Sequence, residues 1–289
     1  MNAAGGNLLC FGMGYTARAL AASLGGGWTV AGTYREDEDN LSSRRGLDID
    51  LVPFDGAETV LAAASHILLS VPPGEAGDPV LEHYQAQLAG RDDLNWIGYL
   101  SSTGVYGDSG GASLDETAPL KPTNARGRRR LEAETAWRNL ADAHGLPLHI
   151  FRLAGIYGPG RSALGQVRAG RARRIGRPGF KFSRIHVDDI VAVLGASMAA
   201  PDPLAVYNVC DDEPVEQEKV VAHACRLLGA EVPPLIPFEQ AEAGMSPMAR
   251  SFWSDHRLVD NSRIKRDLGI TLSHPDYRSG LEAILAAEK

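Results

Sequence analysis

Short apolar runs recur along the first half of the chain, separated by longer amphipathic segments. Most of these runs are apolar at consecutive positions, as expected of strands that helices cover on both faces. Most of the segments between them are compatible with helices, and a long helix that ends at Gly145 precedes the last run. The runs lie at residues 7–12, 28–34, 48–55, 66–73, 95–103 and 147–155. Strands that alternate with helices in this way predict a doubly wound α/β domain with a parallel sheet.

The pattern changes after residue 155. Residues 158–184 are rich in glycine and arginine and show no clear strand. A strand end and a helix are expected over 185–198, and a further strand over 205–211. Helices are expected near 216–229 and 276–288. We therefore predict that residues 1–155, completed by roughly 185–212, form the doubly wound domain, and that residues 156–184 and 213–289 form a smaller lobe.

Composition restricts the classes of partner. The 289 residues are 44% hydrophobic, which is typical of a globular protein. Lys and Arg number 29 against 36 Asp and Glu, so the net charge is 29 − 36 = −7. Because such a surface repels other anions, neither nucleic acid nor a membrane is expected as a partner.

The chain shows neither an apolar run of the ~20 residues that a membrane helix needs nor a signal-like start, so we expect a cytoplasmic protein. The three cysteines, Cys10, Cys210 and Cys225, lack metal-ligand spacing. They are expected to be buried small hydrophobic residues, and no metal site is predicted.

A glycine-rich loop follows the first predicted strand. Gly12, Gly14 and Ala17 fit the pattern G-x-G-x-x-G/A, with Tyr15 and Thr16 between the last two. In this pattern the second glycine lets a pyrophosphate approach the backbone, and the free N–H groups of the following helix attract it. The loop therefore predicts a dinucleotide cofactor in preference to a glycine-rich turn without a ligand.

The end of the second predicted strand bears on the choice of cofactor. Arg35 follows that strand and can pair with a 2′-phosphate, which favours NADP(H) over NAD(H). The acidic run Glu36–Asp39 comes next. One of its carboxylates could instead serve the ribose hydroxyls of NAD(H), or the run could be a solvated loop.

Several further motifs occur in a fixed order along nearly the whole chain. They are LSSTGVYG (100–107), DETAP (115–119), RLAGIYGPGR (152–161), IHVDDI (185–190), VYNV (206–209) and NSRIKRDLG (261–269). Together with the glycine loop, they make the chain similar to the extended short-chain dehydrogenase/reductases, the family of sugar-nucleotide epimerases and dehydratases.

The resemblance implies a Rossmann-type domain with a C-terminal lobe that binds the substrate. It places Asp55 near the adenine and Ser70, Val71 and Pro72 beneath the ribose or pyrophosphate of the cofactor. Ser101 is assigned to the cofactor site as well.

Members of this family use a Ser or Thr together with a Tyr-x-x-x-Lys pair on one helix. Ser102 matches the first of these residues, but Arg126 stands at the tyrosine and Arg130 at the lysine. Arginine stays protonated, so Arg126 cannot exchange a proton as a phenol does. Thr103 and Gly104 also replace the Asp-Glu pair of the family's dehydratases, so ordinary epimerase or dehydratase activity is not expected. Arg130 could still hold ribose hydroxyls or a cofactor phosphate.

Other side chains could supply acid–base chemistry. Tyr106 and Tyr157 are the nearest phenols by motif, and His186 is the nearest imidazole. Each has a structural alternative, since an aromatic ring in a V-Y-G or I-Y-G turn can simply anchor the turn. Asp188 or Asp189, at the start of a predicted helix, is expected to be an N-cap.

Residues 161–184 contain seven arginines, one lysine and no acid. One interpretation is a small anionic substrate bound between this segment and the glycine loop, with Tyr157, Arg161, Arg184 and His186 as contacts. The other is a solvated helix face, balanced by acidic surface elsewhere.

Two functions are therefore open. The first is an atypical NADP(H)-dependent oxidoreductase in which Ser102 orients a carbonyl and Arg126 stabilises the developing oxyanion. The second is a non-catalytic dinucleotide-binding sensor or scaffold. An open substrate cavity beside the nicotinamide C4 would favour the first. Arg126 filling that space, paired with a cofactor phosphate or an acidic side chain, would favour the second. The resemblance also implies that the helix carrying Arg126 can build a homodimer interface.

Overall fold

A computed structural model describes residues 5–35, 49–200 and 202–288. Its centre is a seven-stranded sheet in which every neighbouring pair is parallel. The strands, in spatial order, are β11 (Val206–Val209), β7 (Leu148–Leu153), β5 (Trp96–Ser102), β4 (His66–Leu69), β1 (Asn7–Phe11), β2 (Thr29–Tyr34) and β3 (Asp50–Pro53). The predicted α/β fold with a doubly wound parallel sheet is confirmed.

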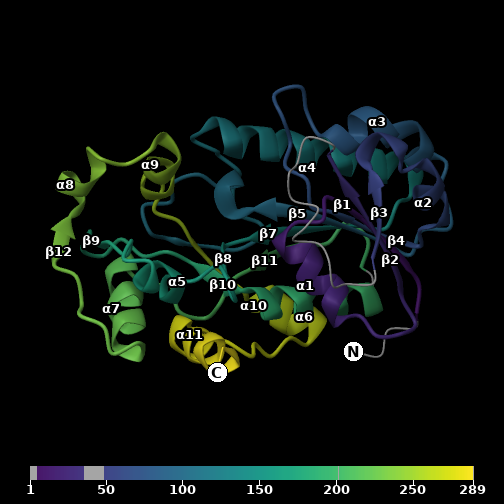
Figure 1. The fold of residues 1–289 in the computed structure, drawn as a ribbon. Helices are drawn as coiled ribbons and strands as arrows, with labels where there is room; N and C mark the ends of the chain where they lie inside the picture. The colour runs from purple at the N-terminus through teal and green to yellow at the C-terminus, as the bar shows by residue number, and fades with distance from the viewer. Residues whose placement is uncertain (1–4, 36–48, 201, 289) are drawn as a thin grey trace.

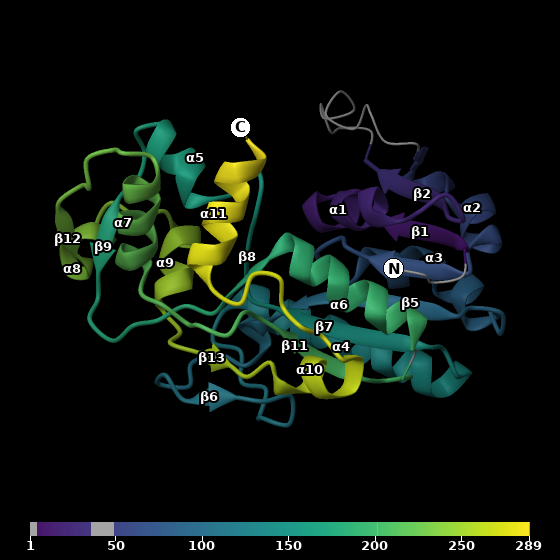
Figure 2. The ribbon, with the colours of Figure 1, turned by 90° about the horizontal axis from the view of Figure 1, so that it is seen from below.

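Helices cover both faces of the sheet (Figures 1 and 2). One layer holds α2 (Glu58–Ala63), α3 (Pro79–Ala89) and α4 (Ala125–His144), and the other holds α1 (Tyr15–Ser23), α6 (Val187–Ala199) and α10 (Ser262–Leu268). Successive residues of β1 serve the two layers alternately. Leu8 and Cys10 pack into the core with α1 and α6, whereas Leu9 and Phe11 pack into the core with α3 and α4. This two-sided burial explains why the strands are continuous apolar runs.

Local sequence fixes the limits of α4, the helix that carries the arginines. The side chain of Asn124 caps its start by accepting the N–H of Gly127 at 2.9 Å. Gly145 ends the helix with a φ of +66°, a left-handed conformation that favours glycine.

The remaining elements gather beyond the carboxyl ends of the strands, at the left of Figure 1. They include α5 (Ala163–Arg168), β9 (Arg174–Gly176), α7 (Gln217–Leu227), β12 (Leu235–Pro237), α8 (Phe238–Glu242), α9 (Pro247–Trp253) and α11 (Tyr277–Ala287). The expectation that 158–184 contains no strand is wrong, because β9 pairs with β12. A three-residue strand is too short to show a period in sequence, and its partner lies far along the chain.

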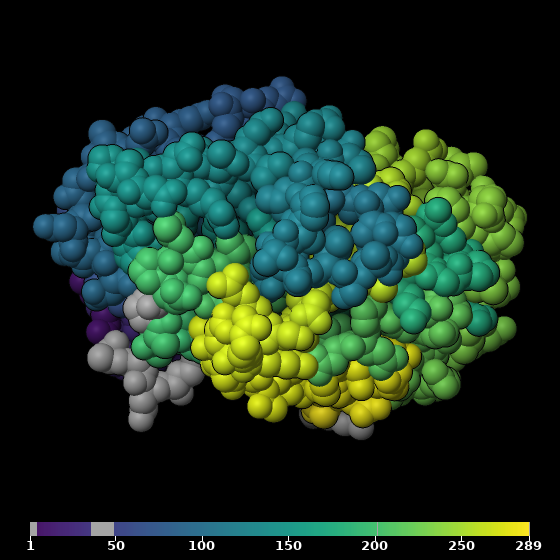
Figure 3. Space-filling view, turned by 180° about the vertical axis from the view of Figure 1, so that it is seen from behind, coloured from purple at the N-terminus to yellow at the C-terminus, as the bar shows by residue number. Residues whose placement is uncertain are grey.

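Two further two-stranded pairings occur outside the central sheet. Strand β8 (Gly155–Tyr157) pairs with β10 (Arg184–His186), and β6 (Ser113–Leu114) pairs with β13 (Leu258–Val259). In the rear view the segment around β6 lies against the late residues that contain β13 (Figure 3). Because β13 directly follows residues 252–257, its pairing with β6 places those residues near the end of β5.

All three cysteines are buried and free, as expected. Burial raises the pKa of the Cys10 thiol to about 12. Across the described residues, every helix is too short or too polar to span a bilayer.

Candidate cofactor and substrate site

The glycine loop lies where the sheet order reverses, since β1 has β2 on one side and β4 on the other. In doubly wound sheets this crevice is where ligands bind. Gly12 has a φ of +86°, and its N–H donates to Thr33 Oγ1 at 2.9 Å. A Cβ at Gly12 would lie 2.7 Å from Cγ1 of Val71, so only glycine fits this turn.

Helix α1 begins directly after Gly14. Gly14 is exposed, and a Cβ there would have only Ser70 Oγ nearby, at 3.6 Å. No side chain caps the helix, so its first N–H groups are available to a phosphate, while Thr16 and Ala17 pack beneath. The loop therefore fits a cofactor pyrophosphate.

Tyr15 forms one wall of this crevice. Its hydroxyl donates to the carbonyl of Pro159 at 2.9 Å, and the guanidinium of Arg161 lies 5.8 Å from its ring centre. Tyr15 precedes β7 in the sequence and Pro159 and Arg161 follow it, so these contacts bring the two parts of the chain together at the phosphate loop.

The other end of the crevice carries the residues expected at the adenosine. Arg35 is exposed at the end of β2, and Asp55 is exposed in the short helix η2 (Phe54–Gly56) after β3. Ser70, Val71 and Pro72 follow β4. The acidic run 36–39, the alternative ribose contact, lies outside the described residues.

Close packing of α4 on the short helix η3 (Thr103–Val105) positions Arg126 and Ser102. A Cβ at Gly127 would lie 2.6 Å from the carbonyl oxygen of Gly104, so glycine is required for this approach. Ser102 Oγ accepts the N–H of Gly104 at 3.1 Å, which leaves the hydroxyl hydrogen free to donate.

A cavity of about 400 Å³ opens between Ser102, α4 and α9. Its charged lining residues are arginines, and none of the described residues that line it is acidic. They are Arg126, Arg129, Arg130 and Arg257.

The four arginines differ in their partners. Arg130 donates to the Leu100 carbonyl at 2.9 Å and to Tyr99 at 3.1 Å, and Arg129 pairs with the exposed Glu75 at 2.6 Å. Arg257 pairs with the buried Asp255 at 2.7 Å. Arg126 is exposed to the cavity and has no hydrogen-bond or ion-pair partner among the described residues. It is therefore available to a ligand.

A second cavity, of about 360 Å³, shares Ser102, Phe252 and Arg257 with the first. It extends to Tyr157 and Arg184, two of the expected substrate contacts. Nη1 of Arg184 donates to the carbonyls of Phe182 and Val215, both at 3.0 Å. Its other guanidinium nitrogens have no acceptor in the described part of the chain.

Two candidates prove to be structural. Tyr106 is 2% exposed, and its hydroxyl donates to Asn208 at 2.7 Å and accepts from Arg152 at 2.9 Å. Burial raises its pKa. Ser101 is buried too and donates to Glu134. Both hydroxyls are buried and hydrogen-bonded to core residues, so neither lines the cavities that share Ser102.

His186 does not line the two cavities that share Ser102. It is 1% exposed, and its Nδ1 accepts the N–H of Asp188 at 3.2 Å, which makes His186 the N-cap of α6. Burial and the adjacent His274 ring lower its pKa to about 4. Asp189 is not a cap, because its carboxylate accepts the N–H groups of Ser273 at 2.7 Å and His274 at 3.1 Å.

The arginines of residues 161–184 fall into two groups: some pair with acidic side chains, and others line a cavity. Arg168 pairs with Glu288 at 2.6 Å and Arg174 with Glu218 at 3.0 Å. Arg161 and Arg184 line a third cavity, of about 490 Å³, beside Tyr157. Only part of the arginine excess therefore faces a ligand space.

Sequence reasoning missed Phe252 and Arg257, and it included Lys181 only as a member of the basic segment 161–184. Phe252 reaches the cavities from α9, and Lys181 and Arg257 reach them from irregular segments. Arg257 forms an ion pair with buried Asp255, which also accepts a hydrogen bond from Thr123 at 2.7 Å. These contacts could not be predicted from the sequence.

The carboxyl group of Asp211, near Tyr157 and Arg184, allows a test of how the stability of the fold depends on pH. It is 2% exposed, and neither carboxylate oxygen has a partner among the described residues. Burial raises its pKa from 3.8 to about 8 despite nearby Arg184. Between these values the folded protein holds a proton that the unfolded chain has lost, so this group makes stability fall as pH rises from about 4 to about 8.

We therefore expect Asp211→Asn to gain stability relative to the wild type as pH rises. Urea unfolding of both proteins at pH 5 and pH 8 measures the difference. A difference that does not change with pH would show that Asp211 is not protonated in the folded state.

Comparisons with known proteins bear on the family and the fold. Residues 86–210 match the model of the NAD dependent epimerase/dehydratase family. Protein YeeZ of Escherichia coli (strain K12) is 29% identical over 282 residues, which cover 92% of this chain and 95% of that protein. A 3-diazoavenalumate denitrifying reductase of Streptomyces sp is 32% identical over 193 residues, 58% of each chain.

Solved structures share the fold over nearly the whole chain. A functionally unknown conserved protein from Silicibacter pomeroyi DSS is 50% identical, with 98% of this chain and 99% of that chain covered and a TM-score of 0.90. UDP-glucuronic acid 4-epimerase from Bacillus cereus, solved in complex with NAD, is 15% identical, with 98% and 100% covered and a TM-score of 0.75. At that identity the likeness concerns the fold.

Proposed function

We propose that this chain is a nicotinamide-dinucleotide-dependent oxidoreductase. Support comes from residues 86–210, which match the model of the NAD dependent epimerase/dehydratase family, and from a fold shared with a UDP-glucuronic acid 4-epimerase solved with NAD. The proposed cofactor is NADP(H) in preference to NAD(H), and the proposed substrate is a small anionic or nucleotide-linked molecule.

One observation carries this proposal: an open cavity lies beside Ser102, its charged side chains are all arginines, and Arg126 has no partner among the described residues. An anionic substrate would supply the missing charge.

The reduction of a carbonyl needs a hydride, a group that stabilises the oxyanion, and a proton. The dinucleotide supplies the hydride when bound. The hydroxyl of Ser102, fixed by the N–H of Gly104, donates a hydrogen bond to the carbonyl oxygen. The guanidinium of Arg126 stabilises the negative charge that develops on that oxygen without giving up a proton.

The proton then comes from water. Tyr106 is buried, and the hydroxyl of Tyr157 donates to the carbonyl of Asp276 at 3.3 Å. The cavity is open at the surface, so water reaches the position that the family's phenol would occupy.

The cofactor preference is tested by titrating the protein with NADPH and with NADH and following nucleotide fluorescence. Arg35→Ala is expected to weaken NADPH binding by about 10- to 100-fold, because it removes a charge-assisted hydrogen bond to the 2′-phosphate. NADH binding should be almost unaffected. Arg266→Ala, which removes an exposed arginine on α10, is the control.

Equal weakening of both nucleotides would contradict the 2′-phosphate contact, and failure to bind either would contradict the proposed function. The activity is tested by following NADPH consumption with small carbonyl compounds that carry a carboxylate or phosphate, beside their neutral esters. Tight binding of the dinucleotide without turnover of any of them would favour the sensor or scaffold.

A further inference from the structure

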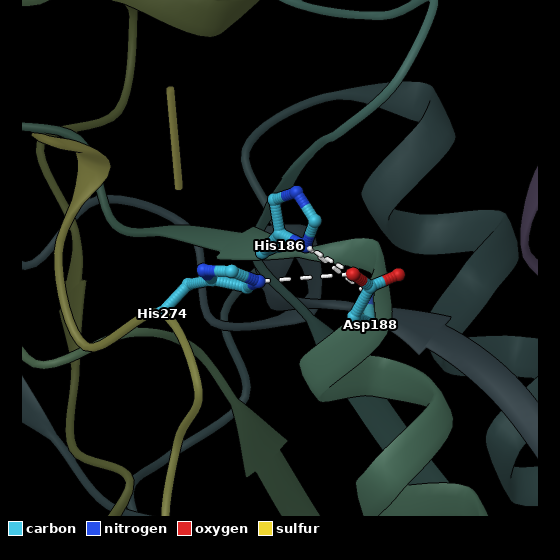
Figure 4. Close-up of side chains that lie close together, drawn as sticks. All are labelled: His186, Asp188 and His274. Atoms are coloured by element: carbon cyan, nitrogen blue, oxygen red, sulfur yellow. Dashed lines mark hydrogen bonds and ion pairs between the residues drawn. The ribbon is translucent and has the colours of Figure 1, made fainter. Parts of the chain in front are cut away.

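Three ligand-type side chains meet at the start of α6, outside the cavities that share Ser102. His186 and Asp188 come from the beginning of that helix, and His274 comes from the segment between α10 and α11 (Figure 4). Oδ2 of Asp188 lies 3.5 Å from Nδ1 of His186 and 3.7 Å from Nε2 of His274. All three ligand atoms lie within 4.8 Å of one another.

The two imidazoles are held in place before any ligand arrives. The ring of His186 packs edge-on against Tyr157, with ring centres 5.1 Å apart, and lies 4.1 Å from the ring of His274. Asp189 fixes the backbone of His274 through its two carboxylate hydrogen bonds. These contacts restrict where the two rings can lie.

Asp188 is the adjustable member of the group. Its side chain is 64% exposed on the first turn of α6, so it can turn toward a bound ion. The tautomer of His186 is also suitable. Its Nδ1 accepts the backbone N–H of Asp188, so Nε2 carries the proton, and a metal ion would take the Nδ1 lone pair in place of that N–H.

The spacing agrees with one class of ion. Two ligands of a tetrahedral metal at about 2.0–2.2 Å are about 3.4 Å apart. The observed separations of 3.5 and 3.7 Å are close to that value. Imidazole with a single carboxylate suits borderline ions such as Zn²⁺ or Co²⁺, whereas Ca²⁺ and Mg²⁺ need more oxygen ligands.

We propose that His186, Asp188 and His274 bind a divalent transition-metal ion of the zinc class, with water at the remaining position. The ion would replace the long hydrogen bond from the N–H of Asp188 to His186. It would join the start of α6 to the segment that leads into α11, and so tie the C-terminal helix to the sheet domain. This role does not depend on the proposed oxidoreductase activity.

The experiment uses the full chain without an affinity tag, freed of metal by a chelator. Co²⁺ titration is expected to give the visible absorption of a four-coordinate ion, saturating at one ion per chain. Zn²⁺ should displace the Co²⁺ signal. A free Zn²⁺ concentration of about 100 times the dissociation constant should raise the unfolding midpoint by about 5 °C.

His274→Ala and Asp188→Asn are expected to lose the Co²⁺ band and most of the Zn²⁺-dependent shift. Both side chains reach the surface, so these variants should fold even if substitution of buried His186 does not. His144→Ala, an exposed histidine in the last turn of α4, is the matched control and should behave as the wild type. No Co²⁺ band in the folded wild type, or an undiminished band in His274→Ala, would overturn the proposal.

Discussion

Replacement of Arg152 by Ala is expected to lower the free energy of unfolding by about 3–5 kcal/mol, because it leaves a buried carboxylate without its counter-charge. Nη2 of Arg152 lies 2.8 Å from Oε2 of Glu134, and the two side chains are 3% and 2% exposed. Burial opposes the charge on Arg152, but the hydrogen bonds and charge of Glu134 outweigh it and raise the pKa of the guanidinium.

The pair is the centre of a larger network. Arg152 also donates to Tyr106, which donates to Asn208, while Ser101 donates to Glu134. These bonds connect the ends of β5, β7 and β11 beneath the candidate site. Loss of Arg152 would therefore leave several buried polar groups short of a partner.

Urea unfolding measures the effect, with Arg129→Ala as the matched control. Arg129 pairs with Glu75, which is 87% exposed, and a surface pair of this kind contributes about 0–1 kcal/mol. The double variant Arg152→Met, Glu134→Leu should lose less stability than Arg152→Ala, because no charge stays buried. Equal costs for Arg152→Ala and Arg129→Ala would contradict this account.

The sheet could be predicted from sequence because its strands are buried on both faces. Runs such as residues 66–73 and 95–103 are apolar at successive positions, and β4 and β5 lie within them. Strands β9 and β12 could not be predicted. Each has three residues, and their pairing is set by the packing of segments distant in sequence.

The site was predictable where a motif fixes the backbone. Gly12 and Gly127 are required by a positive φ and a close approach, and they place the phosphate loop and Arg126. A motif does not tell which way a side chain points, so the burial of Tyr106 in its V-Y-G turn could not be predicted. Arg257 was missed because contacts between segments distant in sequence, such as the pairing of β6 with β13 and the bond from Thr123 to Asp255, bring it to Ser102.

We expect Arg126→Ala to lower kcat by about 10²–10³-fold while the dissociation constant of NADPH stays nearly unchanged. A fall of this size in kcat is expected when an enzyme loses a group that stabilises the oxyanion as its negative charge develops. Neighbouring cations cannot replace it, because Arg130 is held by the Leu100 carbonyl and Arg257 by Asp255. Arg126→Lys keeps the charge but not the planar donors, so its rate should be intermediate.

Single-turnover rates and NADPH titrations, measured on the same preparations with a substrate identified in the carbonyl screen, separate chemistry from binding. Arg128→Ala is the matched control. It removes an arginine from the same helix, but Arg128 donates to the Thr123 carbonyl and lines a hollow on the outer face of α4. An equal loss of NADPH affinity in Arg126→Ala would assign Arg126 to the cofactor. An unchanged rate would remove it from the reaction and leave Ser102 without the cation that replaces the family's phenol.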